Sequence, residues 1–192
     1  MAPQLKEKSL SSWTAPAGYG LNGMVTQKLK PPATHHVSAA VGWVELGAPA
    51  EARAELAQVA PDLQDHPDVL EVRWVIAAEE KKWEEGLLIA QALLQRAPKR
   101  SSGWLHQAYA LRRVPGGSVG KAWEALLPAW EKFPKEAVIP YNLSCYACQM
   151  NQLDTARLWL KRAADAGSKE RIKAMALQDP DLEALWSEIA AL

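Results

Sequence analysis

The chain contains 192 residues, with 22 Lys or Arg and 22 Asp or Glu side chains, so its formal net charge is zero. A balanced charge argues against a nucleic-acid partner and against attachment to an anionic membrane surface, because both need a basic surplus. The chain has only two cysteines, and its N-terminus lacks an apolar core of signal-peptide length. It also lacks an apolar run of about 18 residues. These features predict a soluble cytoplasmic protein.

Residues 1–33 are expected to form an irregular N-terminal extension. They are rich in Ser, Gly and Pro, as flexible linkers are, yet they also carry apolar side chains that a spacer does not need, among them Trp13 and Tyr19. We therefore expect the extension to dock on the rest of the chain, in cis or on a neighbouring molecule; the alternative is a loosely placed tail. Residues 18–23 spell G-x-G-x-x-G, but no strand precedes them and no helix follows, so they predict a flexible turn.

From residue 34 onward, the sequence contains four copies of a unit of about 34 residues. Three columns of small or apolar residues keep the same spacings of 34, 36 and 34 residues. The clearest column contains the small residues Ala52, Gly86, Ala122 and Ala156. Pro98 and Pro134 end two of the units, and the two extra residues of the third unit fall at a Pro-Gly-Gly turn, 115–117, where insertion is tolerated. The units are therefore 34–66, 67–100, 101–136 and 137–167.

Each unit predicts a pair of helices joined by a turn. Apolar residues recur at helical spacing within the units, and turn-forming positions separate the two halves. The first helices are expected at 34–46, 67–80, 101–113 and 137–150. Their partners are expected at 49–60, 83–96, 118–132 and 153–166. The turns are expected at Gly47, Lys81, Gly116-Gly117 and Asn151.

Residues 168–192 are expected to form a helical cap on the last unit. Ser168 has the side chain of a helix N-cap, and Asp179-Pro180 supplies an N-cap followed by a proline at the first helical position. The residues that follow are amphipathic, with Leu182 and Ile189 at helical spacing. A terminal repeat needs its apolar face covered, and this segment is placed to cover it.

The period, the early small residue and the closing proline together resemble the tetratricopeptide repeat. Trp104 stands where that repeat has its first aromatic residue, and residues 141–163 resemble a nearly complete repeat. Three short segments (HPDVLEVRW, KKWEEG and DPDLEALW) resemble a group of small bacterial repeat proteins to which no defined activity attaches. The resemblance implies an all-α fold, a right-handed superhelix (α-solenoid) of four tetratricopeptide-like helical hairpins with a C-terminal capping helix.

In the resembled repeat, the first helix of each hairpin lines an extended concave groove. The register of these helices gives the residues expected to line a peptide-binding groove: Val41, Glu71, Val75, Leu105, Tyr109, Arg112, Arg113, Tyr141, Asn142 and Cys145. Such a surface suits an extended or helical peptide better than a small metabolite. Arg112 and Arg113 can pair with carboxylates, so an acidic partner remains an open alternative. Some members of the family grip C-terminal carboxylates with paired Lys and Asn; only Asn142 resembles that set here, which argues against a chaperone-tail receptor.

No catalytic, cofactor-binding or metal-binding residue is expected. A glycine-rich turn hints at a phosphate-binding loop, but Pro115 and Ala122 stand where a glycine and a hydroxyl are needed. Cys145 and Cys148 form a C-x-x-C pair well inside a helix, where a redox pair gains little thiolate character, so packing is its expected role. The sequence therefore favours a non-enzymatic protein- or peptide-binding scaffold. Two alternatives stay open: a secretion-type chaperone that sequesters an unfolded client, and a metal or thiol sensor that uses the cysteine pair with His106.

Overall fold

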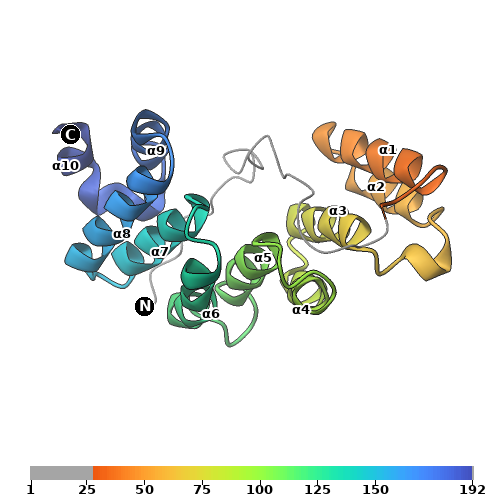
Figure 1. The fold of residues 1–192 in the computed structure, drawn as a ribbon, viewed down its shortest axis with the longest axis horizontal. Coiled ribbons are helices and arrows are strands. Elements are labelled where there is room, and N and C mark those ends of the chain that lie inside the picture. Colours follow the sequence, from red (N-terminus) through yellow and green to blue (C-terminus); the bar gives the residue numbers. More distant parts are fainter. Residues whose placement is uncertain (1–27, 192) are drawn as a thin grey trace. The chain divides into compact units, whose positions relative to one another are not determined.

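The structure is a computed structural model that describes residues 28–191, and these residues form helices and turns without any strand (Figure 1). The all-α fold expected from the sequence is therefore confirmed for this range. The described chain falls into two compact units, residues 28–125 (the N-terminal unit) and residues 126–191 (the C-terminal unit). Residues 1–27, which make up most of the expected docking extension, lie outside the described residues.

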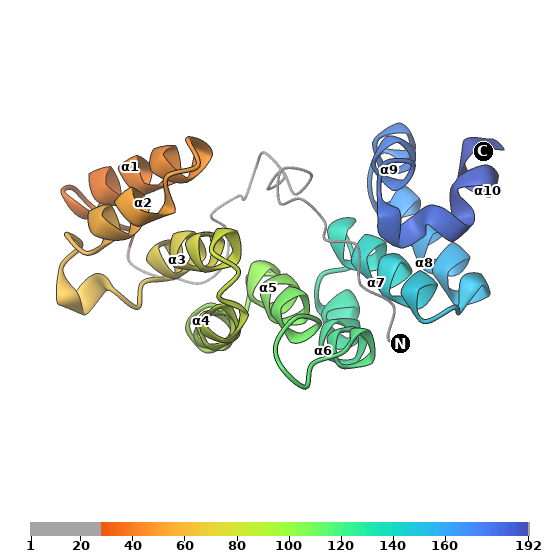
Figure 2. The same ribbon diagram turned by 180° about the vertical axis from the view of Figure 1, so that it is seen from behind.

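The N-terminal unit is built from helix pairs. In chain order, its elements are α1 (Ala33–Glu45), α2 (Pro49–Leu56), the 3₁₀ helix η2 (Pro61–Leu63), α3 (Pro67–Glu79), α4 (Trp83–Arg96), α5 (Ser102–Leu111) and the first part of α6 (Val119–Lys132). α1 packs against α2, and α3 packs against α4, as both ribbon views show (Figures 1 and 2). α4 also packs against α5, which joins the second pair to the third. Apart from the end of α2, these helices begin and end within two residues of their expected positions.

The C-terminal unit contains the end of α6, one further helix pair and the cap. Its remaining elements are α7 (Val138–Gln149), α8 (Leu153–Ala166), α9 (Lys169–Ala176), the 3₁₀ helix η3 (Pro180–Leu185) and α10 (Trp186–Ala191). α7 packs against α8, α8 packs against α9, and η3 packs against α7. The cap is thus three short helical segments. The resemblance implies a single capping helix, whereas the two helix starts predicted from the residues are both present: Ser168 is the N-cap of α9, and Asp179 is the N-cap of η3 with Pro180 at its first position. The extended backbone of Asp179, which the following proline favours, separates α9 from η3.

α2 is the helix that departs most from its expected length. It ends at Leu56 instead of residue 60, and a short turn leads from it to η2. The side-chain amide of Gln64 donates to the carbonyl oxygens of Leu56 and Val59, at 3.0 and 2.7 Å. A helix C-terminus leaves such carbonyl groups without intrahelical partners. Gln64 therefore stabilises the early end of α2.

The turns inside the four helix pairs share one backbone feature. In each turn one residue has a positive φ: Gly47 (71°), Lys81 (57°), Gly116 (71°) and Asn151 (59°). These are turn residues that the sequence predicts. Glycine adopts this conformation freely and asparagine tolerates it, whereas a lysine there costs on the order of 1 kcal/mol. Lys81 is therefore the strained member of the set.

The small residues of the repeat column are buried. Ala52, Ala122 and Ala156 are fully buried, and Gly86 of α4 is buried as well. A Cβ added at Gly86 would lie 3.6 Å from the indole Nε1 of Trp74 on α3. At Gly86, a large flat side chain therefore packs against a small residue within a helix pair. Leu29, from the expected N-terminal extension, is also buried, and it joins the core of the first two helix pairs.

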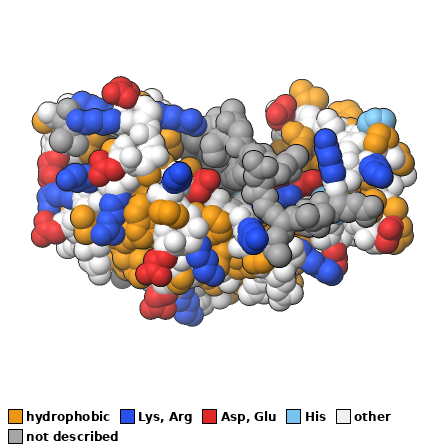
Figure 3. Space-filling model, viewed as in Figure 1, with side chains coloured by type: hydrophobic (Ala, Val, Ile, Leu, Met, Phe, Trp, Pro, Cys, Tyr) orange, Lys and Arg blue, Asp and Glu red, His pale blue; other side chains and the backbone are white. Residues whose placement is uncertain are grey.

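The surface carries both signs of charge. Figure 3 shows basic and acidic side chains interspersed over the face in view, in keeping with the zero net charge of the chain. Exposed large apolar side chains include Val41, Trp43 and Leu46, all at α1 or its C-terminal end. Among the helices of residues 28–191, none combines the length and the apolar character that crossing a bilayer requires.

Candidate functional site

The structure places the predicted groove residues in two different settings. In the N-terminal unit, Val41 is 40% exposed, three residues are half-buried (Glu71, Val75 and Arg113), and three are buried (Leu105, Tyr109 and Arg112). In the C-terminal unit, Tyr141, Asn142 and Cys145 are buried, and η3 packs against the helix that carries them. The chain's own cap therefore covers much of the α7 face that the sequence assigns to a partner.

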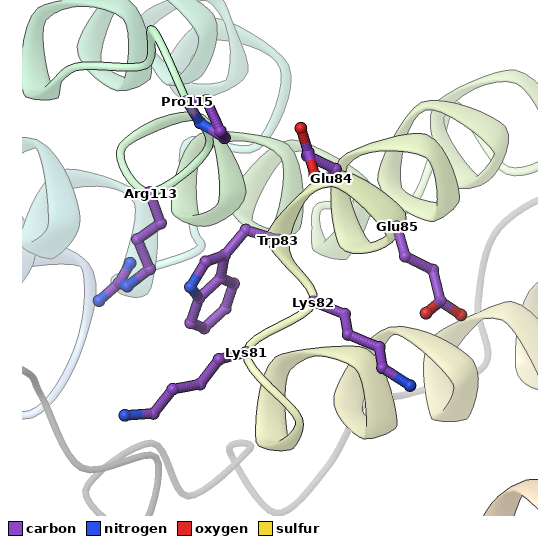
Figure 4. A pocket seen from close by; sticks show the side chains of 7 residues that line it. All are labelled: Lys81, Lys82, Trp83, Glu84, Glu85, Arg113 and Pro115. Carbon is purple, nitrogen blue, oxygen red and sulfur yellow. The ribbon is translucent and has the colours of Figure 1, made fainter.

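An open cavity of about 590 Å³ lies beside the turn between α3 and α4 in the N-terminal unit (Figure 4). Its lining residues are Lys81, Lys82, Trp83, Glu84, Glu85, Arg113 and Pro115. Among these lining residues, Arg113 is the one that the sequence predicts to line the groove. Trp83 was not predicted, because it lies on the second helix of its pair and the prediction used the register of the first helices. The signal that could locate this site in the sequence is an aromatic residue inside the charged block 79–85, at a predicted turn.

Arg113 is held over aromatic rings at this cavity. Its guanidinium carbon lies 3.6 Å from the ring centre of Tyr109 and 5.1 Å from that of Trp83. Its Nη1 donates to the backbone carbonyl of Tyr109 at 2.9 Å. In Figure 4, Lys81 and Arg113 extend to the same side of the Trp83 indole, whereas Glu84 extends away from it. Stacking of this kind orients a guanidinium without using the donors at its edge.

The acidic side chains on the other side of the turn are engaged with cations. Arg53 of α2 donates through Nε to Glu80 at 2.8 Å, and through Nη1 and Nη2 to Glu85 at 2.8 and 2.9 Å. The Nζ atom of Lys82 lies 3.0 Å from the same Glu80 carboxylate. Hydrogen bonding from Arg53 holds the pKa of Glu80 below its ordinary value, so this carboxylate stays charged at neutral pH. These contacts neutralise one side of the turn and tie α2 to it.

Glu71, one of the predicted groove residues, lies in a hydrogen-bond network between α3 and α5. Its Oε2 lies 2.8 Å from Nε2 of His106, and its Oε1 accepts from the hydroxyl of Ser102. An ionised carboxylate only accepts, so Nε2 of His106 is assigned as the donor. The His106 ring stacks on Trp74, with 3.8 Å between ring centres and 9° between the planes.

This network has the residue types of a catalytic site but not the connectivity. A catalytic serine passes its proton to an adjacent histidine, whereas the hydroxyl of Ser102 donates to Glu71. Ser102 and His106 are also almost completely buried. The network joins helices of two successive pairs, and we interpret it as structural.

Stability is expected to fall at acid pH because of Glu71. Burial alone raises the pKa of this carboxyl group, but hydrogen bonds from His106 and Ser102 and the charge of Arg100 outweigh burial and lower it. A lowered folded-state pKa stabilises the fold above the ordinary value of 4.5, and the contribution is lost as the pH falls through the lowered value. Urea unfolding at a series of pH values should show a steeper acid loss for the wild type than for Glu71→Gln. Parallel pH profiles for the two chains would contradict this assignment.

The C-terminal unit brings together metal-ligating side chains that lie far apart in the sequence. Cys145, Asp179 and Asp181 are buried, and their ligand atoms lie within 4.8 Å of one another. Thiolate and carboxylate ligands suit Zn²⁺. The Asp179 carboxylate, however, already accepts from the Tyr141 hydroxyl at 2.9 Å, from the backbone N–H of Asp181 at 3.0 Å and from Cys145 Sγ at 3.5 Å. These contacts identify Asp179 as the N-cap of η3, anchored on α7.

The cysteine pair has surroundings that differ from those considered in the sequence. His106, the third ligand suggested there, bonds to Glu71 in the N-terminal unit. Burial raises the pKa of Cys148, and the negative charges of Asp181 and Asp179 raise it further. This thiol therefore stays protonated at neutral pH, which lowers its reactivity as a nucleophile.

No protein-family model matches this chain, and no curated protein matches its sequence. The chemistry of the cavity at the α3–α4 turn therefore carries the functional proposal. Its three features are a half-buried indole, a stacked guanidinium and a lysine at a strained turn position.

Proposed function

We propose that this chain is a non-enzymatic scaffold that binds a segment of a protein partner at the cavity beside Trp83. The observation that carries the proposal is the joint placement of Trp83 and Arg113 in the lining of an open cavity, with Arg113 stacked on the buried ring of Tyr109. Tryptophan and arginine are among the residue types that dominate binding energy in protein interfaces. The three side chains are already in mutual contact, so less of the free energy of binding is lost to ordering them.

The proposal includes the class of the repeat. Four helix pairs, each with a turn residue at positive φ and a buried small residue in its second helix, support tetratricopeptide-like hairpins. Stacking of these hairpins into a right-handed superhelix, with the first helices on its inner wall, is part of the same proposal. In such a scaffold the cavity beside Trp83 adds an anchoring point at the edge of the wall, where a turn and a second helix contribute.

Photo-crosslinking at the cavity tests the proposed function. The photoreactive residue p-benzoylphenylalanine replaces Glu84, an exposed lining residue of α4, in the full chain produced in its native cells. The matched control carries the same residue at Gln91, which is exposed on the same helix outside the lining. We expect a partner segment to crosslink at position 84 in clear excess over position 91, because only position 84 borders the cavity.

A second variant links the crosslink to the site. Trp83→Ala, with its helical content checked by circular dichroism, should remove the crosslink at position 84, because the indole supplies the main apolar contact. Equal crosslinking at positions 84 and 91, or a crosslink that survives Trp83→Ala, would contradict binding at this cavity.

A further inference from the structure

We infer that the C-terminal unit carries a second peptide-binding surface, where Arg162 pairs with a carboxylate of an acidic, amphipathic segment of a protein partner. This surface, the Arg162 surface, consists of Leu127 and Trp130 of α6 and of Leu158, Trp159 and Arg162 of α8. All five residues belong to the C-terminal unit, so the inference does not depend on the cavity in the other unit. Three features carry it: the stacking of Arg162, its lack of an ion pair within the described chain, and the exposed leucines beside it.

The guanidinium of Arg162 is held against two indole rings. Its central carbon lies 4.4 Å from the ring centre of Trp159 and 5.9 Å from that of Trp130. The two rings meet edge to face, with 5.8 Å between their centres and 88° between their planes. Trp159 is buried, so it forms a fixed support for the guanidinium. Stacking on ring faces orients the N–H donors at the guanidinium edge without using them.

The surroundings of Arg162 differ from those of Arg157, which lies five residues earlier on the same helix. Arg157 donates through Nε and Nη2 to Glu188, both at 2.7 Å, and through Nη1 to Asp154 at 2.6 Å. Within residues 28–191, Arg162 contacts the two indoles and forms no ion pair. A half-buried guanidinium that is oriented in advance can pair with a carboxylate through two parallel N–H bonds, and little side-chain entropy is lost on binding.

Exposed leucines flank the stacked arginine. Leu127 is 39% exposed, and Leu158 is 49% exposed. Residues three or four apart share one face of a helix, so Leu127 lies on the same face as Trp130, and Leu158 on the same face as Arg162. Because Arg162 stacks on Trp130, these two helix faces meet. A peptide with acidic and apolar side chains would cover both the cation and the leucines, whereas an inorganic anion would leave the leucines in water. The zero net charge of the chain argues against a nucleic acid as the anionic partner.

Substitution of Arg162 tests the charge. The probe is a short fluorescein-labelled peptide of Glu and Leu, followed by fluorescence anisotropy with the full chain; the same peptide with Gln in place of Glu is the neutral reference. We expect the Glu peptide to bind more tightly than the Gln peptide, and Arg162→Gln to weaken its binding about tenfold, which corresponds to roughly 1.4 kcal/mol. The matched control Lys161→Gln removes an exposed cation next to it on the same helix and should change the affinity less than about twofold.

Substitution of Leu158 tests the apolar contact with a change that should not disturb the fold, because this side chain is exposed. Leu158→Gln should weaken binding of the Glu peptide about fivefold, since the peptide loses an apolar contact. The control Leu88→Gln removes a leucine of α4 that is 68% exposed in the N-terminal unit, and it should leave the affinity unchanged. Circular dichroism should show the same helical content in all these variants.

Four results would overturn the inference. The first is equal weakening by Arg162→Gln and Lys161→Gln, and the second is equal binding, or no binding, of the Glu and Gln peptides. The third is displacement of the peptide by inorganic phosphate beyond the effect of sodium chloride at equal ionic strength, which would show a site for a free anion. The fourth is a dimer in light scattering that Leu158→Gln dissociates, which would show that a second copy of the chain covers the surface.

One further variant separates the Arg162 surface from the cavity beside Trp83. Trp83→Ala should change the affinity for the Glu peptide less than about twofold. A loss as large as that of Arg162→Gln would mean that the peptide binds at the cavity; the inference would then be wrong and the proposed function would stand. Crosslinking at position 84 tests the proposed function by itself, whatever the peptide does at Arg162.

Discussion

Replacing His106 with alanine should lower the free energy of unfolding by about 3 kcal/mol. His106 is 2% exposed, its ring stacks on Trp74, and its Nε2 bonds to Glu71. The substitution removes the stacking, leaves a void beside Trp74 and takes one donor away from a carboxylate in a largely buried network. Urea unfolding of the full chain, followed by circular dichroism, measures the loss.

Two further variants identify the source of this loss. His106→Phe keeps an aromatic ring against Trp74 and removes only the bond to Glu71, so it should cost about half as much as alanine. His35→Ala changes an exposed residue of α1 and should alter the free energy of unfolding by less than about 0.5 kcal/mol. If His106→Ala cost less than about 1 kcal/mol, apolar packing alone would hold α3 to α5, and the network would be incidental.

The helices and turns could be predicted because their signals are local and recur. A buried small residue and a turn residue mark each copy of the repeat, so one well-marked copy helps to place the others. Lys81 shows most clearly how the repeat helps prediction. Lysine is not a typical turn residue, so only its position within the repeat marks it as one. The early end of α2 was missed for the opposite reason. It depends on a hydrogen bond from Gln64 to Leu56, which no local pattern encodes.

The cavity at the α3–α4 turn depends on contacts between successive helix pairs of the N-terminal unit. Lys81 and Arg113 are 32 residues apart in the sequence, and the packing of α4 against α5 brings them to one indole. Glu71 was assigned to a groove from the register of the first helices alone. Its partners Ser102 and His106 lie 31 and 35 residues further along, in the next pair, and nothing near Glu71 in the sequence indicates them.

The cap shows the same limit at the end of the chain. Its existence follows from the amphipathic residues after Pro180, but its position depends on where Asp179 finds hydrogen-bond donors. The donor on α7 is Tyr141, 38 residues earlier. Tyr141 and Cys145 were therefore read as part of an open groove, whereas η3 packs over the helix that carries them.

Asp179→Ala should lower the free energy of unfolding by about 3 kcal/mol and make the thiols of α7 reactive. Asp179 is buried, and its carboxylate accepts from the Tyr141 hydroxyl, the Cys145 thiol and the backbone N–H of Asp181. Alanine leaves these donors without their acceptor and removes the N-cap of η3. The cap should therefore separate from α7 more often than in the wild type.

Thiol labelling measures this separation directly. Burial and the charges of Asp181 and Asp179 raise the pKa of Cys148, so a thiol-reactive disulfide reagent should label the native wild type slowly at neutral pH. Asp179→Ala weakens both effects and should speed labelling at least about tenfold. The control Asp165→Ala, which removes an exposed carboxylate of α8, should leave the rate unchanged.

The two readouts together decide what holds the cap on α7. Faster labelling with lower stability would mean that the Asp179 contacts keep the predicted groove face of α7 covered, and that a partner can reach Tyr141 only after they break. Lower stability with an unchanged labelling rate would contradict this. The cover would then depend on apolar packing of Leu182 and Leu185, which are both buried in η3, and the α7 face would belong to the core.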